Sequence, residues 1–266
     1  MIIEMPKEEL AYKNEKISHC IYLNSHGTVY KDCEKSPNVP DFLEDRILYV
    51  SSMPIINGYT RPINVLADNN HIYGYEMEYL KDYEPLKTFI GNLPKDENIS
   101  FLKKKIALLN LLKCLRQINE RYIIGDINLN NIMINKQGDI KIIDWENGMP
   151  KDTQLPILSY FNPLYLSNTA TQADSMKMFI CALSLLYETN LEDKCLDFSF
   201  SDLYDFAISL NMHHEIKKFL DDWSYIYMTK SNSVIYFDEY LKKMAFLKSS
   251  NIKRVRRQAP LYGFNY

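Results

Sequence analysis

The chain has little net charge and no long apolar run. Its formal net charge is −3 at pH 7, so it lacks the basic excess of a nucleic-acid-binding protein, and we predict no nucleic-acid partner. No stretch approaches the ~18 consecutive apolar residues of a membrane helix, so we predict no membrane span. The first ten residues lack a basic segment followed by an apolar run, so a signal peptide is not expected.

Cysteine is also sparse and scattered. None of the five cysteines belongs to a C-x-x-C pair, which argues against a zinc site and against a disulfide framework. Scattered free thiols favour a reducing compartment, so we expect a cytoplasmic protein. Hydrophobic residues make up 46% and charged residues 24% of the chain, as in ordinary globular proteins. A length of 266 residues allows one large domain or two small lobes.

The most informative stretch is 122–148, with the sequence YIIGDINLNNIMINKQGDIKIIDWENG. Two apolar runs, 132–134 and 140–143, flank the turn 135–139, which has a glycine near its end. Apolar runs on either side of a glycine-containing loop of three to five residues are typical of a β-hairpin. We therefore predict a hairpin across these two runs.

Three polar residues, Asp126, Asn131 and Asp144, stand at the ends of this hairpin. Because the hairpin folds its second strand back along the first, Asp144 is expected beside Asn131. Mg²⁺ prefers hard oxygen ligands and is bound by few side chains together with phosphates. The pattern predicts that Asn131 and Asp144 bind Mg²⁺, which leaves Asp126 to orient or deprotonate an acceptor. Solvated residues at the ends of an ordinary hairpin are the alternative.

The spacing D-x-x-x-x-N, followed by an apolar strand and I-D-W-E, resembles the catalytic and metal loops of the protein-kinase superfamily. The resemblance implies that Asp126 is the catalytic residue and that Asn131 and Asp144 hold Mg²⁺ on ATP. The sequence departs from the family at Gly125, where kinases carry Arg, and at Asn128, where Ser/Thr kinases carry Lys. The D-W-E ending also resembles aminoglycoside and choline kinases.

Residues before this stretch extend the resemblance. A strand predicted at 28–33 contains V-Y-K, similar to the V-A-I-K strand whose lysine touches the α and β phosphates, so Lys31 is expected to bind ATP. A helix is predicted across 40–50, because Pro40 suits a first helical position and acids follow it. The family implies a helix glutamate paired with the strand lysine, and Glu44 is the first candidate, with Asp45 second. A favourable charge at a helix N-terminus is the alternative.

The stretch 73–80 resembles the strand and hinge that join kinase lobes. Met77 is expected at the back of the adenine pocket, and backbone groups of Glu78 and Leu80 are expected to hydrogen-bond adenine. Met77 follows the strand lysine by 46 residues and precedes the first aspartate of the motif by 49, close to protein-kinase spacing. That interval has room for one long helix, predicted across 100–120, and none for the helices that build a small-molecule pocket.

Three further features bear on the resemblance. The family's Gly-rich loop is missing, because Gly27 is the single glycine before the strand lysine, and the first hairpin turn is expected at 13–16. The stretch 159–164 resembles the end of a kinase activation segment. A strongly apolar helix is predicted across 172–187. The resemblance implies that Asp174, early in this helix, supports the backbone of the catalytic loop. An acid that is merely favourable near a helix N-terminus is the alternative.

The resemblance implies an α+β fold of the bilobal protein-kinase-like type. Its parts would be a small β-rich N-lobe with the hinge at 1–80, a mainly helical C-lobe at 81–250 and a basic tail at 251–266. The implied cofactors are ATP and Mg²⁺, the implied partner is a protein substrate, and the implied reaction transfers the γ-phosphoryl group to a Ser or Thr hydroxyl. Three alternatives remain open: a small-molecule kinase, a nucleotide-binding pseudokinase that acts as an interaction module, and transfer of another part of ATP, such as AMP.

Overall fold

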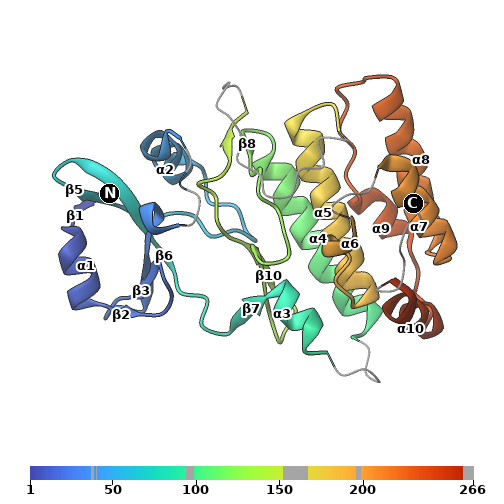
Figure 1. Cartoon of the computed structure of the whole chain (residues 1–266), viewed down its shortest axis with the longest axis horizontal. Coiled ribbons are helices and arrows are strands. Elements are labelled where there is room, and N and C mark those ends of the chain that lie inside the picture. The colour runs from blue at the N-terminus through green and yellow to red at the C-terminus, as the bar shows by residue number, and fades with distance from the viewer. Residues whose placement is uncertain (37–38, 40, 94–98, 152–166, 196–198, 260–266) are drawn as a thin grey trace.

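The computed structural model describes residues 1–36, 39, 41–93, 99–151, 167–195 and 199–259. The protein is a mixed α+β protein, as predicted, with strands concentrated in the N-terminal part and helices in the C-terminal part (Figure 1). The two parts lie one after the other along the long axis of the molecule. The stretch 159–164, which was expected to end an activation segment, lies outside the described residues.

The N-terminal part is built on a six-stranded sheet with the order β1-β5-β6-β4-β3-β2. Its strands are β1 (Ile2–Glu4), β2 (Glu15–Lys16), β3 (Ile21–Leu23), β4 (Thr28–Asp32), β5 (Asn64–Asp68) and β6 (His71–Glu78). β1 runs parallel to β5, and the other neighbours are antiparallel. Successive residues of a strand point to opposite faces, so Val29 and Tyr30 of β4 pack into two different core clusters.

Two helices add apolar residues to these clusters. Leu10 of α1 (Lys7–Lys13) is buried with Tyr30, whereas Leu43 and Ile47 of α2 (Leu43–Ser52) are buried with Val29. A short 3₁₀ helix, η1 (Cys33–Lys35), follows β4. The first hairpin turn predicted at 13–16 is wrong, because these residues end α1 and form β2, and the loop into β3 follows them.

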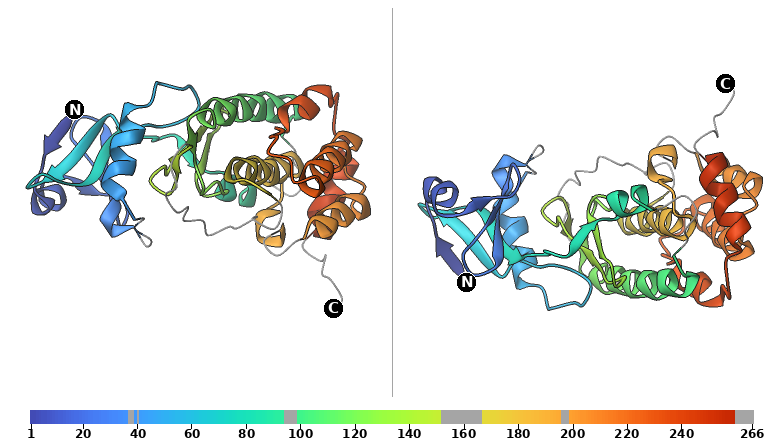
Figure 2. Two further views of the ribbon diagram at one scale, coloured as in Figure 1. Left: turned by 90° about the horizontal axis from the view of Figure 1, so that it is seen from above. Right: turned by 90° about the horizontal axis from the view of Figure 1, so that it is seen from below.

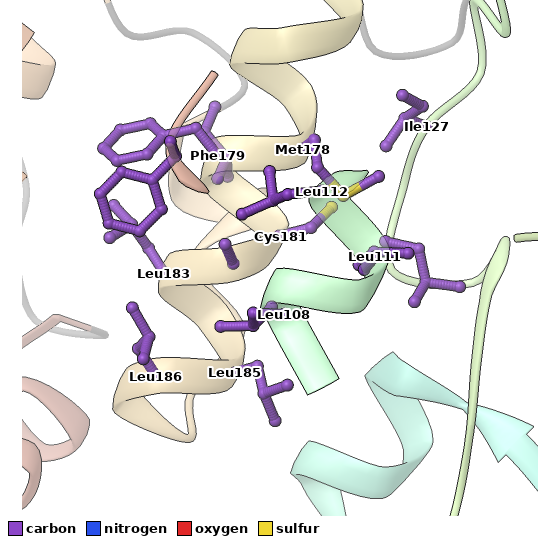
Figure 3. Packing of buried hydrophobic residues seen from close by; sticks show 14 of the residues in the cluster. Leu108, Leu111, Leu112, Ile127, Met178, Phe179, Cys181, Leu183, Leu185 and Leu186 are labelled. Carbon is purple, nitrogen blue, oxygen red and sulfur yellow. The ribbon is translucent and has the colours of Figure 1, made fainter. Parts of the chain in front are cut away.

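The C-terminal part is a helical assembly around α5 (Ala170–Tyr187). The other helices are α3 (Leu86–Gly91), α4 (Phe101–Ile118), α6 (Glu192–Cys195), α7 (Phe200–Ser209), α8 (His214–Met228), α9 (Asp238–Lys243) and α10 (Ser249–Gln258). Almost all of α5 is buried, since it runs through the middle of this part (Figure 2). Leu108 and Leu112 of α4 lie in the same apolar cluster as Met178 and Cys181 of α5 (Figure 3).

The predicted hairpin is confirmed. β9 (Ile132–Asn135) and β10 (Ile140–Ile142) are antiparallel, with Ile140 opposite Ile134. Gly138 in the turn has φ +92°, a conformation that glycine adopts without steric cost. β7 (Tyr83–Pro85) adds to β9 as a third strand, and β8 (Tyr122–Ile123) pairs with β11 (Met149–Pro150).

The connection between α2 and β5 crosses from the N-terminal part into the core of the C-terminal part. Tyr59 forms a parallel bridge with Ile142 of β10, and the Ile142 N–H donates to the Gly58 carbonyl at 2.9 Å. The Tyr59 ring also meets Trp145 edge-on, and both side chains are buried in the cluster that α4 and α5 share. The two parts therefore have a common core along this loop.

The C-terminal segment differs from the expected basic tail. Residues up to Gln258 belong to α10, whose Ile252 and Val255 are buried. The other residues of this helix are basic or polar, because a packed surface helix needs only one apolar face. Across the described ranges, no helix combines the length and the apolar character needed to cross a bilayer.

Candidate functional site

The site is formed where the loop between β8 and β9 meets the segment after β10. The Ile143 N–H donates to the Asn131 carbonyl at 2.9 Å, so the hairpin places Asp144 next to Asn131. Asp144 has φ +63°, in the left-handed region that aspartate tolerates better than most residues. Backbone strain of this kind is common at functional sites, and here it accompanies the change of direction after β10.

Asp126 lies in the same loop and is surrounded by amide donors. Asn128 donates to its Oδ1 at 2.9 Å, Asn131 donates to its Oδ2 at 3.0 Å, and Asn147 donates to the same Oδ2 at 3.3 Å. Only 4% of Asp126 is exposed. Three amide groups therefore fix the position of this carboxylate and turn Asn131 and Asn147 toward it.

Side chains of α5 form hydrogen bonds with the backbone of this loop. Asp174 accepts hydrogen bonds from the N–H groups of Ile124 at 2.7 Å and Gly125 at 2.9 Å, and the Lys177 ammonium donates to the Gly125 carbonyl. Gly125 has φ +76°, which explains a glycine at this position. The predicted support of the loop by Asp174 is confirmed. Burial raises the pKa of Asp174, and Lys177 and the loop N–H groups oppose that rise.

Lys31 of β4 reaches this site from the sheet. Its ammonium lies 2.8 Å from Asp144 Oδ1 and also pairs with Glu146, whose side chain is 2% exposed. Glu146 in turn accepts a hydrogen bond from the Tyr75 hydroxyl at 3.1 Å. Burial alone lowers the pKa of Lys31, but Asp144 and Glu146 outweigh burial and hold that pKa well above its usual value.

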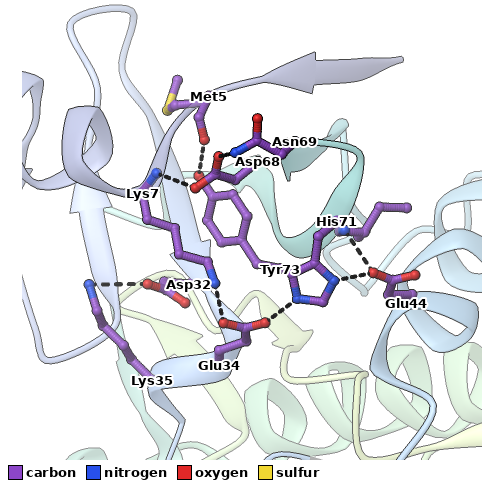
Figure 4. Close-up of polar contacts among 11 residues, drawn as sticks. Met5, Lys7, Asp32, Glu34, Lys35, Glu44, Asp68, Asn69, His71 and Tyr73 are labelled. Atoms are coloured by element: carbon purple, nitrogen blue, oxygen red, sulfur yellow. Dashed lines mark hydrogen bonds and ion pairs between the residues drawn. The ribbon is translucent and has the colours of Figure 1, made fainter.

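The prediction that Glu44 pairs with Lys31 is wrong. Glu44 stands in the first turn of α2, and its carboxylate accepts from the Ile72 N–H at 2.9 Å and lies 2.5 Å from His71 Nδ1 (Figure 4). The His71 Nε2 lies 2.5 Å from Glu34 on the other side. Because α2 begins only at Leu43, Glu44 lies against the start of β6. Glu146 takes the place foreseen for Glu44 beside Lys31.

His71 therefore links η1 and α2, and this link is expected to depend on pH. Hydrogen bonds to Glu34 and Glu44 raise the pKa of His71 above its ordinary 6.5, although partial burial opposes them. The stabilisation is thus complete below pH 6.5 and is lost as pH rises through the higher folded-state pKa. His71→Gln should lower the free energy of unfolding at pH 5.5 by at most about 1 kcal/mol, since the pair is exposed. The loss should disappear at pH 9.

Urea denaturation at both pH values in low salt measures this difference. His26→Gln, at an exposed turn, is the matched control. A His71→Gln effect that is equal at pH 5.5 and pH 9 would show that charge on His71 does not link the two elements.

The residues expected to contact adenine lie at the end of β6 and just beyond it. Met77 is 9% exposed and pairs with Val29, whereas Glu78 is exposed and its carboxylate pairs with Lys141. The Leu80 carbonyl already accepts from the Tyr83 N–H at 3.1 Å. A ligand contact at Leu80 would therefore use its N–H.

The donor set is small for a protein-bound metal. Among the described residues, no group of three or more His, Cys, Asp or Glu side chains has the arrangement of a metal site. Asp144 is 30% exposed at its side chain whereas Glu146 is 2% exposed. Asp144 and Asn131 can thus offer oxygen atoms to Mg²⁺, which needs further ligands from a phosphate or water.

A cavity of about 720 Å³ lies away from this site. It is bounded by the crossing loop 53–58, one face of α4 and the start of β10. None of the predicted site residues lines it. We place the candidate site at the buried charges and not at this cavity, because many of the residues that line the cavity are exposed polar ones.

Fold and site together define a mixed α+β protein with a charged site between a β-rich part and a helical part. The family model described as Seadornavirus VP7 matches residues 62–252, well over half of the chain. The chain therefore belongs to the Seadornavirus VP7 family. No curated protein matches it.

This match overturns the identification of the chain as a protein kinase. The matched family is one of viral VP7 proteins and not a kinase family. The match therefore contradicts the predicted family and the predicted Ser/Thr phosphotransferase activity. It also contradicts the alternatives that rest on kinases. The physical reason is that a few polar residues spaced around a hairpin describe a local arrangement, and the same arrangement can serve different functions. ATP, Mg²⁺, a protein partner and a cytoplasmic location stay predictions.

Proposed function

We propose that the protein binds a divalent cation together with a phosphate-bearing ligand at the site between β4 and the segment after β10. The observation that supports this function is the sharing of Lys31 by two carboxylates, Asp144 and Glu146. Two negative groups and one positive group leave a net negative charge in a largely buried place. Such a place favours the binding of a cation. The proposal is one of binding, and it includes no chemical step.

The roles of the site residues follow from their exposure. Glu146 is enclosed and serves as the permanent counterion of Lys31, whereas the more exposed Asp144 can turn to a cation. Asn131 would supply an amide oxygen, because its nitrogen is already committed to Asp126. Lys31 would then face the phosphate of the ligand. Mg²⁺ and ATP are the cation and the ligand proposed.

A finer description of the fold goes with this proposal. We propose that the chain has a bilobal arrangement of the protein-kinase-like type, with a β-rich N-lobe, a helical C-lobe and the ligand between them. Three features favour this arrangement: the six-stranded sheet with α2 against it, the hairpin β9–β10, and the support of the site loop by α5. The adenine contacts would come from Met77 and from the backbone of Glu78 and Leu80. Fold alone carries no enzymatic function.

Mg²⁺ with ATP should raise the thermal stability of the protein, because a ligand that binds only the folded state stabilises it by mass action. The gain is about 2.7 kcal/mol at a ligand concentration of 100 times Kd. Asp144→Asn keeps the shape and the contact to Lys31 but removes a charge, so it should lose the Mg²⁺-dependent part of the gain. Thermal unfolding with ATP alone, with Mg²⁺ alone and with both separates these contributions.

Asp139→Asn is the matched control, since Asp139 lies at the other end of the same hairpin and bonds to Asn135 at 3.2 Å. It should respond like the wild type. The proposal fails if the wild type shows no stabilisation at millimolar Mg²⁺ and ATP, or if Asp144→Asn and Asp139→Asn respond alike.

A further inference from the structure

Asn147 carries a buried oxygen atom for which the described part of the chain offers no partner. Its Oδ1 is inaccessible and makes no hydrogen bond, whereas its Nδ2 donates to Asp126 Oδ2 at 3.3 Å. The orientation of the amide is fixed by this contact, because the flipped form would place Oδ1 against a carboxylate oxygen. A buried acceptor without a donor is costly, and in native proteins it commonly has a functional explanation.

The backbone holds Asn147 firmly in this place. The Gly148 N–H donates to the Trp145 carbonyl at 2.8 Å, and the Gly148 carbonyl accepts from the buried Arg46 of α2. A Cβ atom at position 148 would lie 2.3 Å from the Ile123 carbonyl oxygen. The turn that carries Asn147 is therefore closely packed on both sides, and the unpaired oxygen does not result from a loose loop.

The partner of the other atom of this amide group, Nδ2, indicates the kind of ligand. Asp126 Oδ2 accepts from Asn131 at 3.0 Å as well as from Asn147, so the two amide groups meet at one atom. Asn131 is the amide to which the proposed function gives a cation contact. The amide oxygen of Asn147 is a hard donor of the kind that Mg²⁺ and Mn²⁺ prefer.

We propose that Asn147 is a cation-binding residue, whose Oδ1 joins Asn131 and Asp144 in holding the divalent cation. This inference rests on the proposed function and adds a ligand that no motif in the sequence indicated. When the cation is bound, the unpaired oxygen gains its partner. The contact of Nδ2 with Asp126 then keeps that oxygen aimed at the cation.

Titration with Mn²⁺ in the presence of ATP, followed by the paramagnetic resonance of free Mn²⁺, tests the assignment. Asn147→Ala removes the oxygen and should weaken Mn²⁺ binding by about tenfold or more, the scale seen when groups around a metal are removed. Asn147→Asp retains an oxygen and adds charge, so it should bind Mn²⁺ at least as tightly as the wild type. Asn130→Ala, an exposed position in the same loop, should bind like the wild type.

The order of the two Asn147 variants decides between a ligand and a structural role. If Asn147 acts only through its bond to Asp126, Asn147→Asp places two carboxylates together and binds Mn²⁺ more weakly than Asn147→Ala. That order overturns the inference while the proposed function stands, as does wild-type affinity in both variants. Absence of Mn²⁺ binding by the wild type overturns the proposed function itself. Thermal unfolding without ligand should show Asn147→Asp as the less stable variant, and Mn²⁺ should restore its stability.

Discussion

Replacing Lys31 by Met is expected to lower the free energy of unfolding by about 3–5 kcal/mol, the usual result of removing one partner from a buried ion pair. Lys31 is 2% exposed and is shared by Asp144 and Glu146. Met retains much of the volume of the side chain and removes its charge. Glu146 is then left without a counterion in a place that water does not reach.

A double-mutant cycle separates the energy of the Lys31–Glu146 ion pair from the effect of the substitutions on packing. Glu146→Gln should return part of the stability when it is added to Lys31→Met, with a coupling of roughly 0.5–3 kcal/mol, because the uncompensated charge is gone and Tyr75 keeps an acceptor. Lys13→Met is the matched control, since Lys13 pairs with Glu9 at the surface and such pairs contribute only about 0.3–0.5 kcal/mol. Urea denaturation of the wild type, the two single variants and the double variant gives the four free energies of unfolding in the cycle, and the same measurement on Lys13→Met gives the control. Similar losses for Lys31→Met and Lys13→Met would rule out a buried pair.

Glu192→Gln is expected to stabilise the protein above neutral pH. Glu192 of α6 lies under the site loop, where its two oxygens accept from the Leu129 N–H at 3.2 and 3.3 Å. Burial raises the pKa of Glu192 to about 7, with a smaller contribution from Asp193, and the Leu129 N–H and Lys87 oppose the rise. The folded state thus retains a proton that the unfolded chain releases near its ordinary pKa of 4.5.

The sign of the pH effect follows from this difference. The stabilisation that the bound proton provides is complete below pH 4.5 and is lost as pH rises through about 7. At pH 8 the charged and buried carboxylate costs as much as about 3 kcal/mol, at roughly 1.4 kcal/mol for each pKa unit. Gln still accepts from Leu129 and carries no charge, so its advantage should appear between pH 5 and pH 8.

Chemical denaturation across this range provides the test. Asp193→Asn, at the exposed neighbour, removes only the smaller contribution to the raised pKa of Glu192, so it should keep most of the wild-type pH dependence. If the difference between Glu192→Gln and the wild type is the same at pH 5 and pH 8, Glu192 does not titrate in this window.

The local features of the fold could be predicted because each is determined by residues close in the chain. The hairpin β9–β10 follows from two apolar runs around Gly138, and the buried character of α5 follows from its largely apolar sequence. The place of Asp174 beneath the loop was also foreseen from the resemblance. The mixed α+β class is the part of the predicted fold that the structure confirms.

Features that depend on distant contacts escaped prediction. The parallel pairing of β1 with β5 joins residues more than 60 positions apart, and nothing in a strand as short as Ile2–Glu4 indicates a partner. Glu146 was not foreseen as the counterion of Lys31, because an acid after Trp145 could equally stand in a solvated turn. Asn147 gave no sequence signal, since its importance lies in an unpaired atom that only the packed structure reveals.

The basic character of the C-terminal segment concealed a helix. Ile252 and Val255 are three positions apart, which places both on one face, and that spacing was the available sign of packing in α10. The family was misjudged for a different reason. Spacing between polar residues describes geometry at one site, whereas membership of the Seadornavirus VP7 family is carried by residues 62–252 as a whole.

The crossing loop between α2 and β5 has a consequence for any attempt to divide the molecule. A cut at the stretch between β6 and β7 would leave Tyr59 on one fragment and its partners Ile142 and Trp145 on the other. The helical fragment would expose an aromatic side chain and an unpaired strand edge, and the β-rich fragment would carry an apolar loop without a cover. We therefore expect that residues 1–80 and 81–250, the two proposed lobes, do not fold as independent domains. A chain shortened to one of them would recruit the missing contacts from a second molecule or aggregate.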